Sequence, residues 1–213
     1  MNLDLLTSEG VEAAVDALEK DLLAPTGPAI STMRNHNFAI LLYPPRDEYK
    51  TRARINRLVK TVEAEGWGVH SIALHQLVLQ RFRALEGEEG IASRIDREKR
   101  NFAKDPDRAL VGLKQQLSEL IDGEEGLAKD VAQSIETYRA QNPHLGDRIL
   151  VVLARAGALY PFVRSSALLK KLGGKTHNLP VVLLYPGKRH ENGGLSFMEE
   201  LAPDSDYRPR IYA

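Results

Sequence analysis

The sequence predicts an α/β protein in which a mostly parallel sheet, Rossmann-like or degenerate P-loop-like, is sandwiched by helices. Two short apolar runs, 149–153 (ILVVL) and 181–185 (VVLLY), are rich in β-branched residues and too short for helices. We expect each run to be a strand buried on both faces. Between them, residues 163–172 carry apolar side chains near helical spacing, and Gly173 and Gly174 end the pattern. Two buried strands joined by a helix predict a right-handed parallel crossover.

The first 85 residues predict a second unit of the same alternating kind. An apolar run at 38–43, closed by Pro44 and Pro45, predicts another buried strand. The remaining elements expected in this half are helices over 8–23, 47–65 and 75–85 and a short strand over 68–74. These patterns do not predict the order of the strands in the sheet.

The stretch between the two halves predicts an inserted helical hairpin. Residues 86–104 are charged, contain glycine and are weakly periodic, which indicates a loop or a poorly packed helix. Asp105 and Pro106 suit a helix start, since Asp caps free N–H groups and Pro fits the first turn. We expect an αα-hairpin over about 105–142, inserted into a single domain spanning 1–213 or forming a separate lobe. Its two apolar stripes are Leu110, Leu113, Leu117 and Leu120, followed by Leu127, Val131, Ile135 and Tyr138.

Composition limits the class of protein. Basic and acidic residues balance at 29 each, so no global field draws the chain to nucleic acid or anionic lipid. The absence of cysteine excludes disulfides and thiolate metal sites. No apolar stretch has the length of a membrane span, and the N-terminus lacks a signal-peptide layout. We therefore expect a cytoplasmic protein without membrane contact.

Three Tyr-Pro pairs follow predicted strands and define a candidate strand-end cleft. The tyrosines are Tyr43, Tyr160 and Tyr185, and the carboxyl ends of parallel strands are where such sheets bind ligands. The simpler interpretation, which we favour, is that proline stops each strand and tyrosine covers its end. Arg164 belongs to the same candidate cleft, because a cation in a first helical turn needs an anionic partner. An internal carboxylate is favoured over a ligand.

Catalytic motifs are not supported by the sequence. Gly174, Lys175 and Thr176 resemble the end of a phosphate-binding loop, but Leu169 stands where that loop needs glycine, and the segment follows a helix instead of preceding one. We interpret it as a helix-ending turn. The six histidines show no metal-ligand spacing, no serine lies in a nucleophile elbow, and the tail carboxylates form no acid-base pair. We expect no enzyme activity, no cofactor and no metal.

Two basic segments are candidates for DNA contact. The helix over 47–65 presents Lys50, Arg54 and Arg57 near one face, although its acidic residues dilute the charge. Residues 94–104 form the second candidate, with four cations between positions 97 and 104. A solvated helix face is the favoured interpretation of both.

The C-terminal tail supplies candidate contact residues. Residues 188–194 read as a polar loop, and 195–198 and 207–212 are expected to add short strands. Phe197, Tyr207, Arg208 and Arg210 are side chains of the type that anchors interfaces, or they pack the tail onto its own sheet. Both alternatives stay open at the level of sequence.

Residues 153–212 contain several short blocks in a specific order and spacing. These are Gly157-Ala158-Leu159-Tyr160-Pro161-Phe162-Val163-Arg164, Leu168-Leu169 with Leu172, Pro180-Val181-Val182-Leu183-Leu184-Tyr185-Pro186-Gly187, Leu195-Ser196-Phe197-Met198 and Tyr207-Arg208. In these blocks the segment resembles the BrxB family, the small component of BREX bacteriophage-exclusion systems. One departure is Arg155, where a small residue is expected before the Gly157 turn; it weakens the case for an anion site there.

The resemblance implies a non-catalytic role in antiviral defence. Proteins of this family work beside a DNA methyltransferase, a large ATPase and a phosphatase-like PglZ protein, with PglZ as the expected direct partner. A scaffold that docks PglZ and supports host DNA methylation and phage restriction is therefore the favoured function, through the 186–194 loop, the 207–212 tail or the inserted hairpin. The alternatives are a degenerate nucleotide-binding domain, with a Rossmann-like or P-loop-like sheet, and an accessory protein that binds DNA directly.

Overall fold

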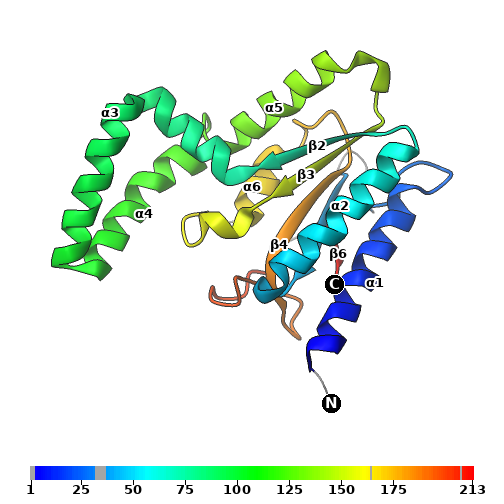
Figure 1. Cartoon of the computed structure of the whole chain (residues 1–213), viewed down its shortest axis with the longest axis horizontal. Helices are drawn as coiled ribbons and strands as arrows, with labels where there is room; N and C mark the ends of the chain where they lie inside the picture. The colour runs from blue at the N-terminus through cyan, green and yellow to red at the C-terminus, as the bar shows by residue number, and fades with distance from the viewer. Residues whose placement is uncertain (1–2, 32–36, 164, 207) are drawn as a thin grey trace.

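A computed structural model describes residues 3–31, 37–163, 165–206 and 208–213, and shows a three-layer α/β/α arrangement (Figure 1). Its helices are α1 (Leu3–Leu22), α2 (Glu48–Ala64), α3 (Leu74–Lys104), α4 (Pro106–Asp122), α5 (Leu127–Gln141) and α6 (Ser165–Leu172). Its strands are β1 (Phe38–Tyr43), β2 (Gly68–Ala73), β3 (Ile149–Ala154), β4 (Val181–Arg189), β5 (Leu195–Phe197) and β6 (Arg210–Tyr212). The α/β class with a mostly parallel sheet covered by helices is confirmed.

The sheet has the order β2-β3-β4-β1-β6, and all of these neighbours are parallel. The crossover from β3 through α6 to β4 joins adjacent parallel strands, as the two apolar runs predict. Strand β5 pairs antiparallel with the end of β4. The 68–74 strand lies at one edge of the sheet, and the segment that ends the chain lies at the other.

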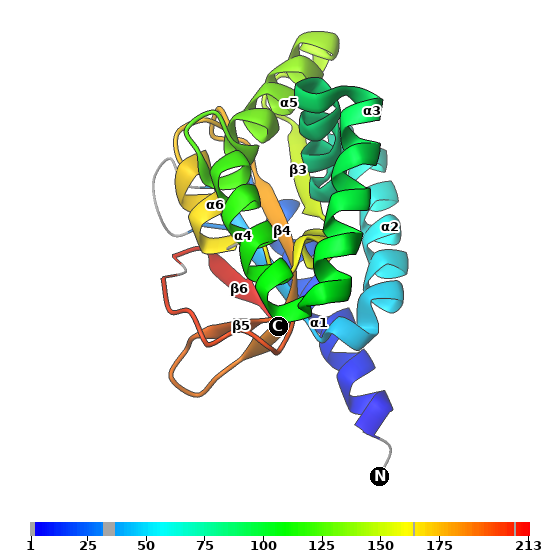
Figure 2. The same ribbon diagram turned by 90° about the vertical axis from the view of Figure 1, so that its left-hand side faces the viewer.

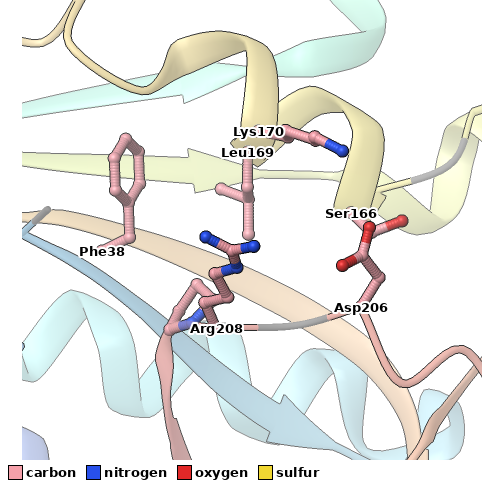
Figure 3. Close-up of a pocket in the computed structure, with 7 residues that line it drawn as sticks. Phe38, Ser166, Leu169, Lys170, Asp206 and Arg208 are labelled. Atoms are coloured by element: carbon pink, nitrogen blue, oxygen red, sulfur yellow. The ribbon is translucent and has the colours of Figure 1, made fainter. Parts of the chain in front are cut away.

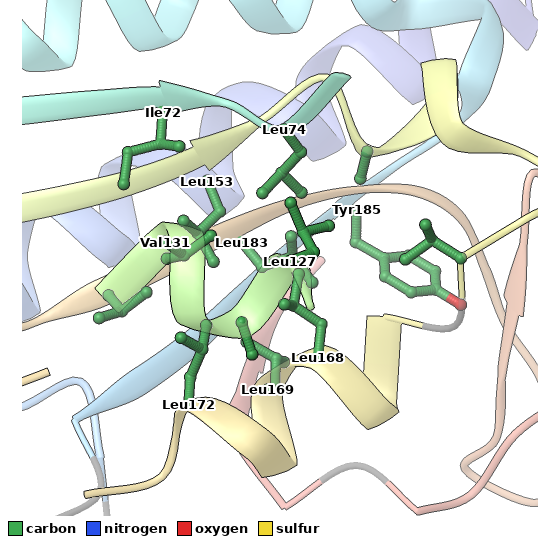
Figure 4. Packing of buried hydrophobic residues seen from close by; sticks show 14 of the residues in the cluster. Ile72, Leu74, Leu127, Val131, Leu153, Leu168, Leu169, Leu172, Leu183 and Tyr185 are labelled. Atoms are coloured by element: carbon green, nitrogen blue, oxygen red, sulfur yellow. The ribbon is translucent and has the colours of Figure 1, made fainter. Parts of the chain in front are cut away.

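Alternate side chains of each central strand enter two separate cores. Phe38, Ile40 and Leu42 of β1 belong to one core, whereas Ala39 and Leu41 belong to the other, because successive side chains of a strand point to opposite faces. Helices α1 and α2 cover the second core. Helices α5 and α6 cover the first, where the residues in contact include Leu127, Val131, Leu168, Leu169, Leu172, Ile72, Leu153, Leu183 and Tyr185 (Figure 4).

Helices α3 and α4 form an arm that projects from the body. Helix α3 bends at Gly87, whose positive φ of 67° interrupts the helical conformation, and its second half then runs beside α4 (Figures 1 and 2). The start of α4 is capped as predicted, because the Asp105 carboxylate accepts the Arg108 backbone N–H at 3.0 Å. Two hydrogen-bonded contacts join the helices, from Arg94 and Arg97 to the Gln116 side chain. We name residues 88–122 the arm.

The arm changes the expected boundaries of the helical hairpin. Residues 88–104 form a helix that pairs with α4. Of the two structures predicted for 86–104, a loop or a poorly packed helix, the structure has the helix. The predicted partner of α4 was the helix over 124–142. That helix, α5, lies on the sheet instead, because the stripe of Leu127, Val131 and Ile135 is buried in the first core.

Strand β4 continues past the predicted stop at Pro186 and Gly187. Pro186 is the last residue in register with β1, opposite Tyr43, and the strand then changes partner to β5. Proline has no N–H to donate, but no hydrogen bond is lost here because Pro186 lies where the strand leaves β1 and joins β5. The Pro186 carbonyl accepts the Met198 N–H at 2.8 Å. Gly187 permits the close approach of the strands, since a Cβ there would lie 2.3 Å from the Ser196 carbonyl oxygen.

Candidate functional site

Asp206, Arg208 and Pro209 line a cavity of about 100 Å³ together with residues of α6 and Phe38 of β1. Figure 3 shows the Arg208 guanidinium between Phe38 and Leu169, while Asp206 faces Ser166. The Ser166 hydroxyl donates to the nearby Asp204 carboxylate at 2.6 Å, which ties the tail to the start of α6. A volume of this size holds roughly three water molecules, so it suits an ordered side chain or a small ion and excludes a nucleotide.

The other tail candidates pack onto the protein itself. Phe197 is 4% exposed, and its ring meets Tyr185 edge-on with centroids 5.2 Å apart. Arg210 pairs with Asp21 of α1 at 2.8 Å and lies over the Tyr212 ring. Phe197 therefore packs inside the protein, whereas Arg210 stays partly exposed beside α1, and its role as a contact residue remains a prediction.

The remaining candidates of the tail and of the strand-end cleft are Tyr207, Arg164 and Arg208. Tyr207 and Arg164 lie outside the described residues. Arg208 is exposed apart from its place at the cavity. Among the described tail candidates, Arg208 and Arg210 are exposed, whereas Phe197 is buried.

The strand-end tyrosines do not share one site. Tyr43 lies in the core under α1 and α2, whereas Tyr185 lies in the opposite core, because they occupy alternate faces of neighbouring strands. Tyr43 donates its hydroxyl to Glu48 at 2.5 Å, and burial, with this contact to Glu48, raises the pKa of Tyr43 above its ordinary value. Tyr160 packs near Phe197 with centroids 6.4 Å apart. Only Tyr43 of the three ends a strand, because β4 continues to Arg189 and β3 ends at Ala154, before Tyr160.

A crevice nevertheless exists at the carboxyl ends of β1 and β3, beside Pro186 of β4. It has a volume of about 190 Å³ and forms where the segments after β1 and β3 depart to opposite faces of the sheet, the usual ligand position in such folds. Arg155 enters it from a left-handed backbone position (φ 64°), with one guanidinium nitrogen 3.6 Å from Glu48. Its lining residues are Pro45, Glu48, Arg155, Gly157, Ala158, Pro186 and Met198.

This crevice is poorly suited to phosphate. The loop after β1 begins with Pro44 and Pro45, which have no N–H to offer an anion. The carboxylate of Glu48, in the first turn of α2, already contacts Arg155 and Tyr43. The chain's own anion therefore occupies the position that a nucleotide phosphate would take, and this weakens the nucleotide-binding alternative.

The glycine-rich segment after α6 is a helix-ending turn, as predicted. Helix α6 ends at Leu172, the Lys175 N–H bonds to the Leu172 carbonyl at 2.9 Å, and Gly174 has a positive φ of 75°. Thr176 is buried. This segment presents no helix N-terminus to a ligand.

The α2 candidates for DNA contact face the acidic residues of α1. Arg54 is 8% exposed and pairs with Glu12, Asp16 and Glu19. Burial by itself would lower the pKa of Arg54, but hydrogen bonds to two of these carboxylates outweigh it and leave that pKa raised. Arg57 also pairs with Glu12, at 2.8 Å, and Lys50 lies 3.7 Å from Asp47. The positive charges of these three candidates are matched within the molecule, which disfavours a phosphate interface through them.

The arm exposes large apolar side chains that the sequence pattern did not mark as exposed. Phe102 is 62% exposed, Val111 56%, Ile95 48% and Leu110 40%. The stripe that includes Leu110 predicts a packed helix face, and no local signal tells where along the helix the packing partner ends. The arm is the part of the described chain where exposed apolar surface gathers on one projecting element.

No group of three or more His, Cys, Asp or Glu residues is placed to hold a metal ion within the described ranges. In the same part of the chain, none of the helices combines the length and the apolar character that crossing a membrane requires.

The fold and these sites define a class of protein, a three-layer α/β domain with a projecting helical arm. Its cavities described above are small, whereas its arm exposes several large apolar side chains. A family model described as BREX protein BrxB matches residues 70–211, two thirds of the chain. The chain belongs to the BrxB family, and the resemblance carried by residues 153–212 is confirmed. A search of curated proteins found no match, and neither did a search of solved structures.

Membership makes this chain a component of a BREX anti-phage system. BrxB is an accessory family of these systems with no known catalytic role. The matched span begins within β2 and includes the arm, the crevice loop after β3 and most of the tail. All three surfaces described above therefore belong largely to the family's common region.

Proposed function

We propose that this protein is a non-catalytic, cytoplasmic docking component of its BREX system, which binds the PglZ-type protein and thereby supports host DNA methylation and phage restriction. Family membership supports the defence role. The observation that carries the docking role is the arm, which holds Ile95, Phe102, Leu110 and Val111 in solvent. A PglZ-type protein is the partner that the resemblance to BrxB implies.

The exposed side chains of the arm favour docking on energetic grounds. Full burial of a Leu, Ile or Phe side chain is worth about 1.5–3 kcal/mol, and the arm leaves much of this unrealised at several neighbouring positions. Isolated exposed apolar residues need no explanation, but a gathering on one projecting element is typical of an interaction site. Aromatic residues at such sites tend to contribute most of the binding energy.

Co-purification of the full chain with the PglZ-type protein of the same system tests the proposal, with size-exclusion chromatography and light scattering to measure the mass. We expect a stable complex that Phe102→Ser weakens by roughly 10-fold or more. Tyr49→Ser is the matched control, because Tyr49 is 82% exposed on α2, away from the arm. Separate elution of the unaltered proteins at micromolar concentration would refute the docking role.

A further inference from the structure

The apolar stripe of α4 passes from the protein core into solvent along one helix face. Ile121 and Leu117 are 4% and 7% exposed and belong to the first core, Leu113 packs partly against it, and Leu110 is 40% exposed. These residues follow each other at spacings of three or four, so they share a face. The core that α5 and α6 complete at the base of the arm therefore has no covering element farther out.

The other helix of the arm also exposes apolar side chains. Ile95 and Phe102 are seven residues apart, which places both on one face of α3, and both are about half exposed or more. Two paired helices bury one side of each other, and a third helix is the usual means of covering the remaining apolar surface. The distal arm, residues 94–114, has the character of a bundle that lacks one helix.

The charge of the distal arm indicates what kind of helix fits. Residues 94–114 include seven basic and four acidic residues, although the chain as a whole is balanced. Within the described residues, no carboxylate forms an ion pair with Arg100, Lys104, Arg108 or Lys114. This contrasts with Arg54 and Arg57 of α2, whose charges are matched internally. The unmatched cations select a partner that brings negative charge.

We propose that the distal arm docks an amphipathic, acidic helix of the partner protein, whose apolar face covers Ile95, Phe102 and Leu110 and whose carboxylates pair with the free cations. The inference rests on the proposed function and names the contact surface and the chemistry of the partner. A second copy of this chain would bring the same positive charge to the interface, so self-association is disfavoured. Nucleic acid would match the charge, but phosphates do not require exposed Phe and Leu side chains.

The test compares two charge-reversal variants of the full chain in binding to the PglZ-type protein. K104E/R108E alters the arm, and K60E/K175E is the matched control, because Lys60 and Lys175 are exposed cations of the body outside the arm, the 186–194 loop and the 207–212 tail. Titration calorimetry at low and moderate salt measures both. We expect the arm variant to bind the PglZ-type protein roughly 10-fold or more weakly than the unaltered chain, and its affinity to depend much less on salt. The affinity of the control should stay within about twofold of that of the unaltered chain. Circular dichroism melts show whether both variants are folded.

Each other outcome has a definite meaning. If the unaltered chain binds and the folded arm variant binds equally well, the inference is wrong while the proposed function stands. If the unaltered chain does not bind, the proposed function falls and the inference falls with it. Arm-dependent dimers in light scattering, or a DNA duplex shifted by the unaltered chain and released by the arm variant, would assign the surface to a different occupant and overturn the inference.

Discussion

Arg54 is predicted to fasten α1 to the rest of the protein, and Arg54→Ala tests this. Its guanidinium is nearly buried between α1 and α2 and reaches three carboxylates, Glu12, Asp16 and Glu19. Hydrogen bonds to charged groups contribute about 1.5–3 kcal/mol each at most. The carboxylates are 28–67% exposed and regain water when the arginine is removed, so their desolvation adds little.

We therefore expect Arg54→Ala to lower the free energy of unfolding by about 2–3 kcal/mol. For a chain of this length the Tm should fall by roughly 4–12 °C. Urea titration followed by circular dichroism measures the first quantity and calorimetry the second. Lys50→Ala is the control on the same helix, since its side chain is 57% exposed and it should change stability by less than about 0.5 kcal/mol.

An Arg54→Ala variant as stable as the unaltered chain would contradict this account. The cluster would then be a set of surface contacts without energetic weight, and α1 would be held by its apolar face alone. A folded variant of unchanged stability that loses affinity for duplex DNA would further reopen α2 as a nucleic-acid surface.

Two further predictions concern backbone packing and pH. Gly187→Ala should destabilise the fold by about 1–3 kcal/mol, because its Cβ would meet the Ser196 carbonyl. Gly112→Ala is the control and should be neutral or stabilising, because a Cβ at this position of α4 meets no neighbouring atom. Urea titration measures the free energy of unfolding of both variants. Burial lowers the pKa of His70 in the folded protein. Below roughly pH 6.5 the unfolded chain therefore binds more protons at this residue than the folded chain does. The contribution of His70 to the free energy of unfolding should be fully present above that pH and should be lost as the pH falls. Melting curves from pH 7.5 to 5 should show a smaller acid loss in His70→Gln than in the exposed-site control His144→Gln, and equal losses would count against this assignment.

Local patterns along the chain were sufficient for most elements. The runs at 38–43 and 149–153 appear as strands with nearly the expected bounds, because continuous apolar residues with β-branching suit strands buried on both faces. The stripe of Leu127, Val131 and Ile135 correctly predicts a helix with one buried face. The boundaries that moved, at Pro186 and at residues 88–104, are places where the element pairs with the segment that follows it, β5 and α4, and the local pattern does not show this pairing.

The candidate site depended more heavily on contacts between distant residues. The sequence could place Tyr43 and Tyr185 in strands but not on opposite faces, since that depends on the register between β1 and β4. It marked Arg54 as a surface cation because the acidic side chains that bury it lie on another helix. It marked Leu110 as a packing residue although the covering element ends before reaching it.

The sequence by itself therefore determined the α/β class, the helices and strands, the parallel crossover and the resemblance to BrxB. The tertiary structure alone decided the strand order, the burial of Phe197, the internal ion pairing of Arg54 and Arg57 and the exposure of the arm. The physical reason is the range of the interactions. Periodicity and capping act between residues a few positions apart, whereas burial and ion pairing depend on which distant segments the folded chain brings together.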